Sequence, residues 1–156
     1  MSAEPRWLTD DEMAAWLPLV ALVTLLPQAL DRQLREDAGI GHVYYQILAM
    51  LSEAPDRTLR MSDLAHRTWS SRSRLSHAVD RLEENGWVQR VRCPTDKRGS
   101  FAVLTDAGYA VLADIAPTHV DSVRRHLFDQ LTPDQVEALR EVSEVVSTQL
   151  STAQEE

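Results

Sequence analysis

The sequence predicts a mainly α-helical fold with one small β-hairpin. Three observations favour this class. Apolar residues recur every three or four positions along several long stretches, as on one face of an α-helix. Helix-forming residues dominate, with 5 Gly and 7 Pro in 156 residues. Two short β-type stretches, 87–92 and 100–104, flank a turn-rich loop. The length fits one domain with a sizeable core.

The first predicted helix runs from about Asp10 to Asp37. Thr9 and Glu12 have the spacing of a capping box at its start. Pro18 and Pro27 lie inside it, and each removes a backbone hydrogen bond, so we expect a bend or break. Residues 13–30 carry no charge, and this segment is long enough to span a membrane. The prolines and the isolation of the segment favour burial by a partner subunit instead.

Three further helices precede the hairpin. We expect them at Val43–Glu53, at Asp63–Thr68 with Ser62 as N-cap, and from Ser70 or Ser71 to the Asn85-Gly86 stop. The last two form a helix-turn-helix. Trp69 occupies the junction, and we expect it to pack between them.

The helix after Trp69 has two distinct faces. Its apolar positions fall at i, i+3, i+4 and i+7, namely Leu75, Ala78, Val79 and Leu82. Ser73 and His77 point away from that face. Hydrogen-bond donors lie in its N-terminal half and carboxylates in its C-terminal half. This polarity suits a recognition helix that enters the major groove by its N-terminal end.

The remaining elements predict a winged helix-turn-helix. Strands Trp87–Arg92 and Ser100–Leu104 enclose the loop Cys93–Gly99 and form the wing. Thr105-Asp106 caps a long helix that reaches about Asp129. Thr132, Pro133 and Gln135 begin a Val- and Leu-rich last helix. We expect residues 151–156 to fray.

The charge is unevenly distributed. The chain has a net charge of −8. Residues 56–98, however, contain ten Lys or Arg and six Asp or Glu, a net of +4 that leaves −12 for the remainder. A basic middle in an acidic protein fits a local phosphate-binding surface. A solvated surface of mixed charge is the alternative.

Four motifs resemble the multiple antibiotic resistance regulator (MarR) family. They are Met61-Ser-Asp-Leu-Ala65, Asp80-Arg-Leu-Glu-Glu-Asn-Gly-Trp-Val88, Asp96-Lys-Arg-Gly99 and Leu104-Thr-Asp-Ala-Gly108. The resemblance implies a homodimer that binds a palindromic operator in double-stranded DNA. It also implies repression that a small, often aromatic, ligand relieves. The corresponding regions are 1–37, an N-terminal dimerisation helix; 38–104, the winged helix-turn-helix; and 105–156, C-terminal dimerisation helices. The apolar first and last helices are consistent with a homodimer, since a two-fold partner would bury their apolar faces.

The expected DNA contacts lie on the recognition helix and the wing. By resemblance, Arg98 enters the minor groove, where a guanidinium suits the negative potential. Asp96 fixes the wing tip through an arginine, and Lys97 is a phosphate contact or a solubilising charge. The candidates for base edges are Ser73, Arg74, Ser76 and His77. Those for phosphates are Ser70, Ser71 and Arg72, with Arg60, Arg90 and Arg92 weaker. A helix cap or a solvated charge is the plain alternative for each.

Other binding roles are less supported. Trp16, His42, Tyr44 and Tyr45 are candidates to line an effector pocket, although aromatics at helical spacing are more often core. Cys93 lies near several cations that could lower its thiol pKa, so a redox-responsive regulator is an alternative to a small wing residue. No histidine pair has i, i+4 spacing, and we expect neither metal nor cofactor.

The sequence disfavours an enzyme. It has no visible nucleophile–base set and no Gly-rich phosphate loop. One cysteine excludes an internal disulfide and fits a reducing cytoplasm. No basic-then-apolar signal opens the chain, so we expect a cytoplasmic protein with no membrane partner. A winged-helix module for protein contacts is the second function class.

Overall fold

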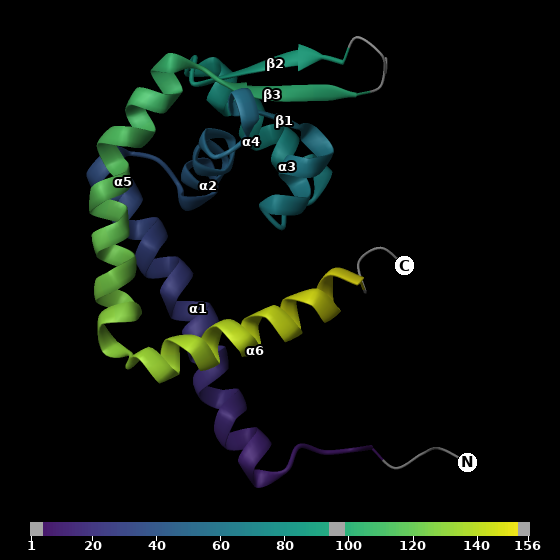
Figure 1. The fold of residues 1–156 in the computed structure, drawn as a ribbon, viewed down its shortest axis with the longest axis vertical. Helices are drawn as coiled ribbons and strands as arrows, with labels where there is room; N and C mark the ends of the chain where they lie inside the picture. The colour runs from purple at the N-terminus through teal and green to yellow at the C-terminus, as the bar shows by residue number, and fades with distance from the viewer. Residues whose placement is uncertain (1–4, 94–98, 153–156) are drawn as a thin grey trace. The chain divides into compact units, whose positions relative to one another are not determined.

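The computed structural model describes residues 5–93 and 99–152, and it is mostly helical (Figure 1). The helices are α1 (Asp10–Ala38), α2 (His42–Ser52), α3 (Met61–Arg67), α4 (Arg72–Glu84), α5 (Asp106–His126) and α6 (Pro133–Thr152). The strands are β1 (Thr58–Arg60), β2 (Val88–Arg92) and β3 (Ser100–Leu104). Short 3₁₀ turns, η1 (Pro55–Arg57) and η2 (Phe128–Gln130), complete the order. The predicted fold class, a winged helix-turn-helix, is confirmed.

The chain divides into two compact units, residues 1–119 and 120–156. The predicted boundaries after residues 37 and 104 both fall inside the first unit. The reason is a small apolar cluster in which Leu34 of α1, Ile40 and Ile115 of α5 are buried together. The two flanking helices therefore share packing with the winged helix.

The three strands form one antiparallel sheet in the order β1-β3-β2. The β2–β3 hairpin pairs Val88 with Leu104 and Arg92 with Ser100, as a wing requires. The sequence analysis missed β1. This strand has three residues and buries only Leu59, so no alternation is visible in its sequence.

The start of α3 also differs from the prediction. Ser62 lies inside this helix, whose N-cap is Arg60 without a side-chain hydrogen bond. Ser62 instead donates to the Asp63 carboxylate at 3.1 Å. The helix starts earlier than predicted because it follows β1 directly.

The predicted break at Pro18 or Pro27 does not occur, because helix α1 is continuous through both residues. Its predicted capping box is present, with Thr9 N–H donating to Glu12 at 2.8 Å and Glu12 N–H donating to Thr9 at 3.2 Å. Gly39 ends the helix at φ 68°, a left-handed conformation that favours glycine.

The core of the first unit is organised around α4. All four predicted apolar residues, Leu75, Ala78, Val79 and Leu82, are buried. They pack with residues of α2, α3 and the sheet in one cluster. The helical period of this stretch therefore predicted the inward face correctly.

The prediction that Trp69 packs between α3 and α4 is wrong. Its side chain is 62% exposed and contacts His66, with ring centroids 5.8 Å apart. Trp69 has φ 52°, a left-handed conformation that turns the chain between the helices in place of the usual glycine.

The two C-terminal helices begin as predicted. Gly108 N–H donates to the Thr105 hydroxyl at 3.0 Å at the start of α5. Gln135 N–H donates to Thr132 at 3.3 Å, and Thr132 N–H donates to the Gln135 side chain at 2.9 Å. However, α5 ends at His126, earlier than predicted, and the 3₁₀ turn η2 follows. Helix α6 continues through Thr152, so Ser151 is helical.

Candidate nucleic-acid interface

The outer face of α4 begins at a defined cap. Ser71 is the N-cap, and its hydroxyl accepts from Arg74 N–H at 3.3 Å. Because the four apolar residues face inward, Ser73, Arg74 and His77 are exposed and Ser76 is half-buried. The helix thus presents hydroxyl, guanidinium and imidazole groups along its first two turns, as a base-reading helix requires.

Unpaired positive charge lies at the N-terminal half of this helix. Among the described residues, neither Arg72 nor Arg74 has a carboxylate partner. In contrast, Arg81 pairs with Glu84 at 2.9 Å, further along the same helix. The positive charge available to an anionic ligand is therefore concentrated at the end of α4 whose backbone N–H groups also favour anions.

Arg90 occupies a different position from the one we expected. Its guanidinium pairs with Asp80 at 2.7 Å and lies 3.6 Å from the Glu83 carboxylate. It also donates to the Ser76 hydroxyl at 3.4 Å. These contacts argue against the predicted phosphate contact, because two carboxylates already neutralise the side chain.

A groove of about 320 Å³ separates the start of α4 from the base of the wing. Among the described residues, its lining includes three arginines and three serines and no carboxylate: Arg60, Arg72, Arg90, Ser62, Ser76 and Ser100. Arg60 comes from β1, and its guanidinium lies 5.3 Å from the centre of the Phe101 ring. Since Arg90 is neutralised, Arg60 and Arg72 supply the charge of this groove.

Predicted wing residues are described only at the base of the hairpin. Arg92 is exposed at the end of β2. Cys93 is 7% exposed, and its sulfur lies 3.9 Å from Arg60. Burial limits access of an oxidant, which weighs against the redox alternative. Asp96, Lys97 and Arg98 lie outside the described residues.

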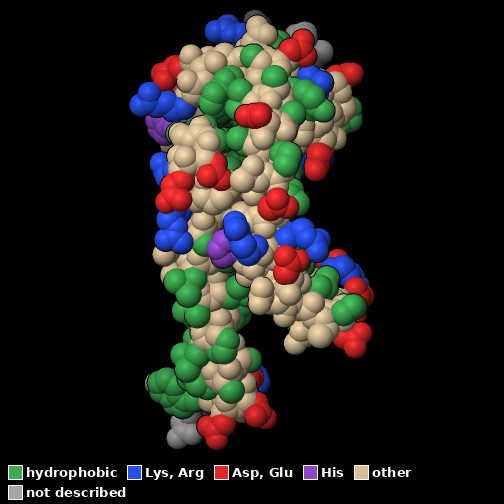
Figure 2. Space-filling view, turned by 90° about the vertical axis from the view of Figure 1, so that its left-hand side faces the viewer, with side chains coloured by type: hydrophobic (Ala, Val, Ile, Leu, Met, Phe, Trp, Pro, Cys, Tyr) green, Lys and Arg blue, Asp and Glu red, His purple; other side chains and the backbone are tan. Residues whose placement is uncertain are grey.

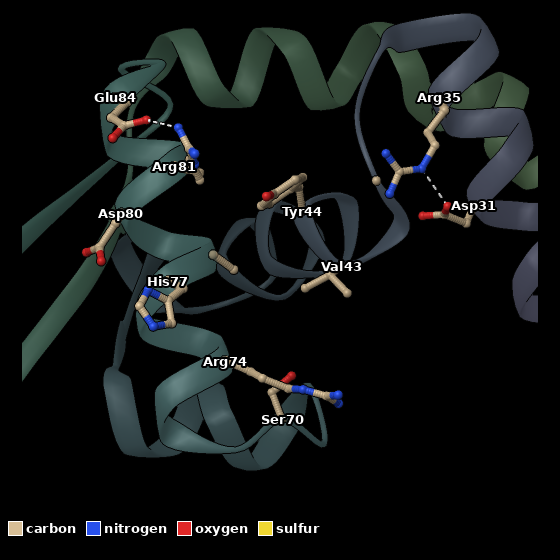
Figure 3. Close-up of a pocket in the computed structure, with 12 residues that line it drawn as sticks. Asp31, Arg35, Val43, Tyr44, Ser70, Arg74, His77, Asp80, Arg81 and Glu84 are labelled. Carbon is tan, nitrogen blue, oxygen red and sulfur yellow. Dashed lines mark hydrogen bonds and ion pairs between the residues drawn. The ribbon is translucent and has the colours of Figure 1, made fainter.

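A larger cavity of about 700 Å³ lies on the other side of α4 (Figure 3). Arg74, His77 and Arg81 line it from α4, and Tyr44 lines it from α2. At its α1 edge, Arg35 donates to Asp31 at 2.6 Å and lowers the pKa of that carboxyl group. Arg74, His77 and Arg81 lie on one face of α4 at helical spacing. This spacing was the feature of the sequence that could have predicted the α4 side of the cavity.

The four predicted effector residues do not share this cavity. Tyr44 is among its lining residues, whereas Trp16, His42 and Tyr45 are not. Trp16 is half-exposed on α1. His42 and Tyr45 instead contact His119, with ring centroids 5.6 and 4.1 Å apart.

Comparison with known proteins identifies the family. A model described as the MarR family matches residues 38–99. The crystal structure of Sco3205, a MarR family transcriptional regulator from Streptomyces coelicolor in complex with DNA, is 55% identical in sequence. It superposes with a TM-score of 0.89 and covers 94% of this chain and 91% of its own. The chain belongs to the MarR family.

Two further similar proteins are also transcription regulators by name. AbsC, a MarR family regulator from Streptomyces coelicolor, is 40% identical, with a TM-score of 0.89 over 95% of this chain and 99% of its own. YkoM, an HTH-type transcriptional regulator of Bacillus subtilis, is 32% identical over 67% of this chain. The match spans 66% of YkoM, just under two thirds of its length.

Two helices of this MarR protein expose apolar side chains that its own described core does not cover. On α1, Trp16, Leu17 and Val23 are 50 to 62% exposed, and Figure 2 shows hydrophobic side chains gathered at the N-terminal end of this helix. On α6, Val142 and Val145 are 61 and 71% exposed. By length and composition alone, α1 could cross a membrane, and no other described helix could.

The described residues contain no group of three His, Cys, Asp or Glu side chains arranged for a metal ion. His42 and His119 lie side by side, but the Asp31 carboxylate beside them already accepts from the His42 backbone N–H at 2.9 Å. Gln33 lies 3.0 Å from His119 Nδ1, and Tyr45 packs on the same ring.

Burial makes the histidine pair sensitive to acid. It lowers the pKa of both His42 and His119, and the charge of His42 lowers the pKa of His119 further. The unfolded chain therefore binds protons at a pH where the folded chain does not. We expect the free energy of unfolding to fall as the pH drops from 7.5 to 5.

Urea titrations at the two pH values measure this effect. His119→Gln should reduce the loss on acidification, whereas His66→Gln, at an exposed position, should leave it unchanged. An equal pH dependence in wild type and His119→Gln would contradict the assignment.

Proposed function

We propose that this protein is a sequence-specific, DNA-binding transcription regulator that acts as a homodimer. Helix α4 enters the major groove, and the wing contacts the flanking minor groove through Arg98. The observation that carries the proposal is that Arg72 and Arg74, at the donor-rich end of α4, are exposed and have no carboxylate partner in the part of the chain that the structure describes. The DNA complex of Sco3205 supports it.

The dimer accounts for the exposed apolar faces. A second copy of the chain would cover α1 and α6, which an isolated protein would leave in water. It would also place two copies of α4 on one duplex, so the preferred site is palindromic. This explanation of α1 needs no membrane and fits a cytoplasmic protein.

Repression relieved by a small ligand is the regulatory mode we favour. MprA of Escherichia coli, 23% identical over 72% of this chain and 63% of its own length, is a transcriptional repressor. The cavity between α2 and α4 supports ligand control, because Arg74 and His77 belong both to its wall and to the predicted DNA-reading face. A molecule bound there would compete with DNA for these side chains.

The salt dependence of binding tests whether the protein binds DNA and whether the groove at the base of the wing contacts phosphates. Binding to duplex DNA should weaken steeply with salt as phosphates release their counterions. We expect Arg60→Gln to weaken binding to selected and random duplexes equally. It should also reduce the slope of log K against log salt by about 0.9. Arg60→Lys should keep the slope.

Fluorescence anisotropy at several salt concentrations measures both quantities. A wild-type response to duplex DNA that does not depend on salt would contradict a phosphate-binding interface and favour the protein-interaction module instead. An unchanged slope in Arg60→Gln would remove only this residue from the interface.

Arg74 is expected to determine sequence preference. Arg74→Ala should reduce the ratio of selected to random affinity by about 5- to 150-fold, because a bidentate arginine–base pair contributes about 1–3 kcal/mol of discrimination. Arg81→Ala is the matched control on the same helix, since Arg81 is already paired with Glu84. Competition between the two duplexes measures the ratio. Equal losses on both duplexes in Arg74→Ala would contradict base readout.

A further inference from the structure

We propose that Arg90 is a positioning residue of the DNA interface, which holds α4 against the wing and presents the Ser76 hydroxyl to DNA as a hydrogen-bond donor. This inference rests on the proposed DNA-binding function and assigns a task to a residue that does not itself contact DNA.

Arg90 joins β2 to two turns of α4. Its Nη2 donates to the Asp80 carboxylate at 2.7 Å and to the Ser76 carbonyl oxygen at 3.2 Å. Its backbone N–H donates to the Glu83 carboxylate at 2.6 Å. One wing residue therefore contacts three residues of the helix, which fixes the rotation of α4 relative to the hairpin.

The surroundings of Arg90 exclude a direct role as a phosphate ligand. Its side chain is only 28% exposed. The Nε atom is buried without a hydrogen-bond partner and lies 3.6 Å from Glu83 Oε2. With Asp80 and Glu83 both beside it, the guanidinium brings no net positive charge to a nearby anion. Its loss would leave these two carboxylates unpaired near the DNA.

The contact with Ser76 gives Arg90 an influence on base preference. A serine hydroxyl has one proton and two lone pairs, so a free serine can either donate or accept. Arg90 Nη1 donates to Ser76 Oγ at 3.4 Å and occupies a lone pair. The hydroxyl proton and one lone pair remain, and Ser76 lies on α4 directly before the exposed His77. The Arg90 contact therefore biases Ser76 towards donating to an acceptor in the major groove, such as a purine N7, guanine O6 or thymine O4.

A double-mutant cycle tests this coupling. Wild type, Arg90→Lys, Ser76→Ala and the double variant are titrated with the tightest duplex recovered from a random pool and with a random duplex. Each single substitution should weaken binding to the selected duplex about 10-fold. Because Arg90 acts through Ser76, the double variant should bind no more weakly than the weaker single variant. The salt slope should stay at the wild-type value in all four.

Arg92→Gln is the matched control, two residues further along β2 and exposed. It should lower the salt slope by about 0.9 and combine additively with Ser76→Ala. If Arg90→Lys does not fold, as judged by circular dichroism, Asp80→Asn replaces it, since it loosens the same contact.

Additive losses for Arg90→Lys and Ser76→Ala, or a reduced salt slope in Arg90→Lys, would overturn the inference while leaving DNA binding intact. A wild-type protein that binds neither duplex would instead contradict the proposed function itself.

Discussion

Replacement of Gly108 by alanine is expected to destabilise the protein by about 3 kcal/mol, at the upper end of the usual cost of overpacking. A Cβ atom at this position would lie 2.1 Å from the Trp87 carbonyl oxygen and 2.8 Å from Leu104 Cδ1. The Trp87 oxygen belongs to the backbone and accepts from Thr105 N–H at 3.0 Å, so it cannot move without breaking the start of α5.

Urea denaturation at a fixed protein concentration measures the change in the free energy of unfolding. Gly41→Ala is the control, because its Cβ would meet mainly the end of the flexible Arg35 side chain, at 3.2 Å. We expect a cost below about 1 kcal/mol there, typical of an N-cap change. A Gly108→Ala variant as stable as Gly41→Ala would show that α5 can shift away from Trp87 at little cost.

Replacement of Val145 by glutamate is expected to raise the dissociation constant of the dimer by about 100-fold or more. Val145 is 71% exposed on α6 beside Val142, and the proposed partner subunit covers both. A carboxylate placed in such an interface would lose its hydration without gaining a partner.

Sedimentation velocity over a range of concentrations measures the dissociation constant. Ser143→Glu adds the same charge to an exposed position of the same helix, and we expect it to stay dimeric. A Val145→Glu protein that remains dimeric would place the dimer interface elsewhere. Circular dichroism then separates dissociation from unfolding of α6.

Structure was predicted most accurately from the sequence where a regular spacing of residues determines it. The inward face of α4 follows from four apolar residues at helical spacing, and all are buried. The capping boxes of α1 and α6 involve residues three positions apart, so both were visible in the sequence.

Structure was predicted least well where a contact joins segments distant in the sequence or where the backbone conformation is unusual. Strand β1 exists because Thr58–Arg60 pair with β3, more than forty residues later. The left-handed Trp69 replaces a glycine that the motif normally has. Arg90 resembled a free cation until its contacts with Asp80 and Glu83 were seen. The wing tip at residues 96–98 remains a prediction from resemblance.

Thr105 links two helix ends through a single oxygen atom. Its hydroxyl donates to the Gly86 carbonyl, just beyond the end of α4, at 2.7 Å and accepts from Gly108 N–H in the first turn of α5 at 3.0 Å. A torque applied to α5 at this end would therefore reach the residues that follow α4 through two hydrogen bonds on the same oxygen atom. Exchanging this one polar side chain would remove both hydrogen bonds, and we expect it to free the two helix ends from each other while the hydrophobic interior stays unchanged.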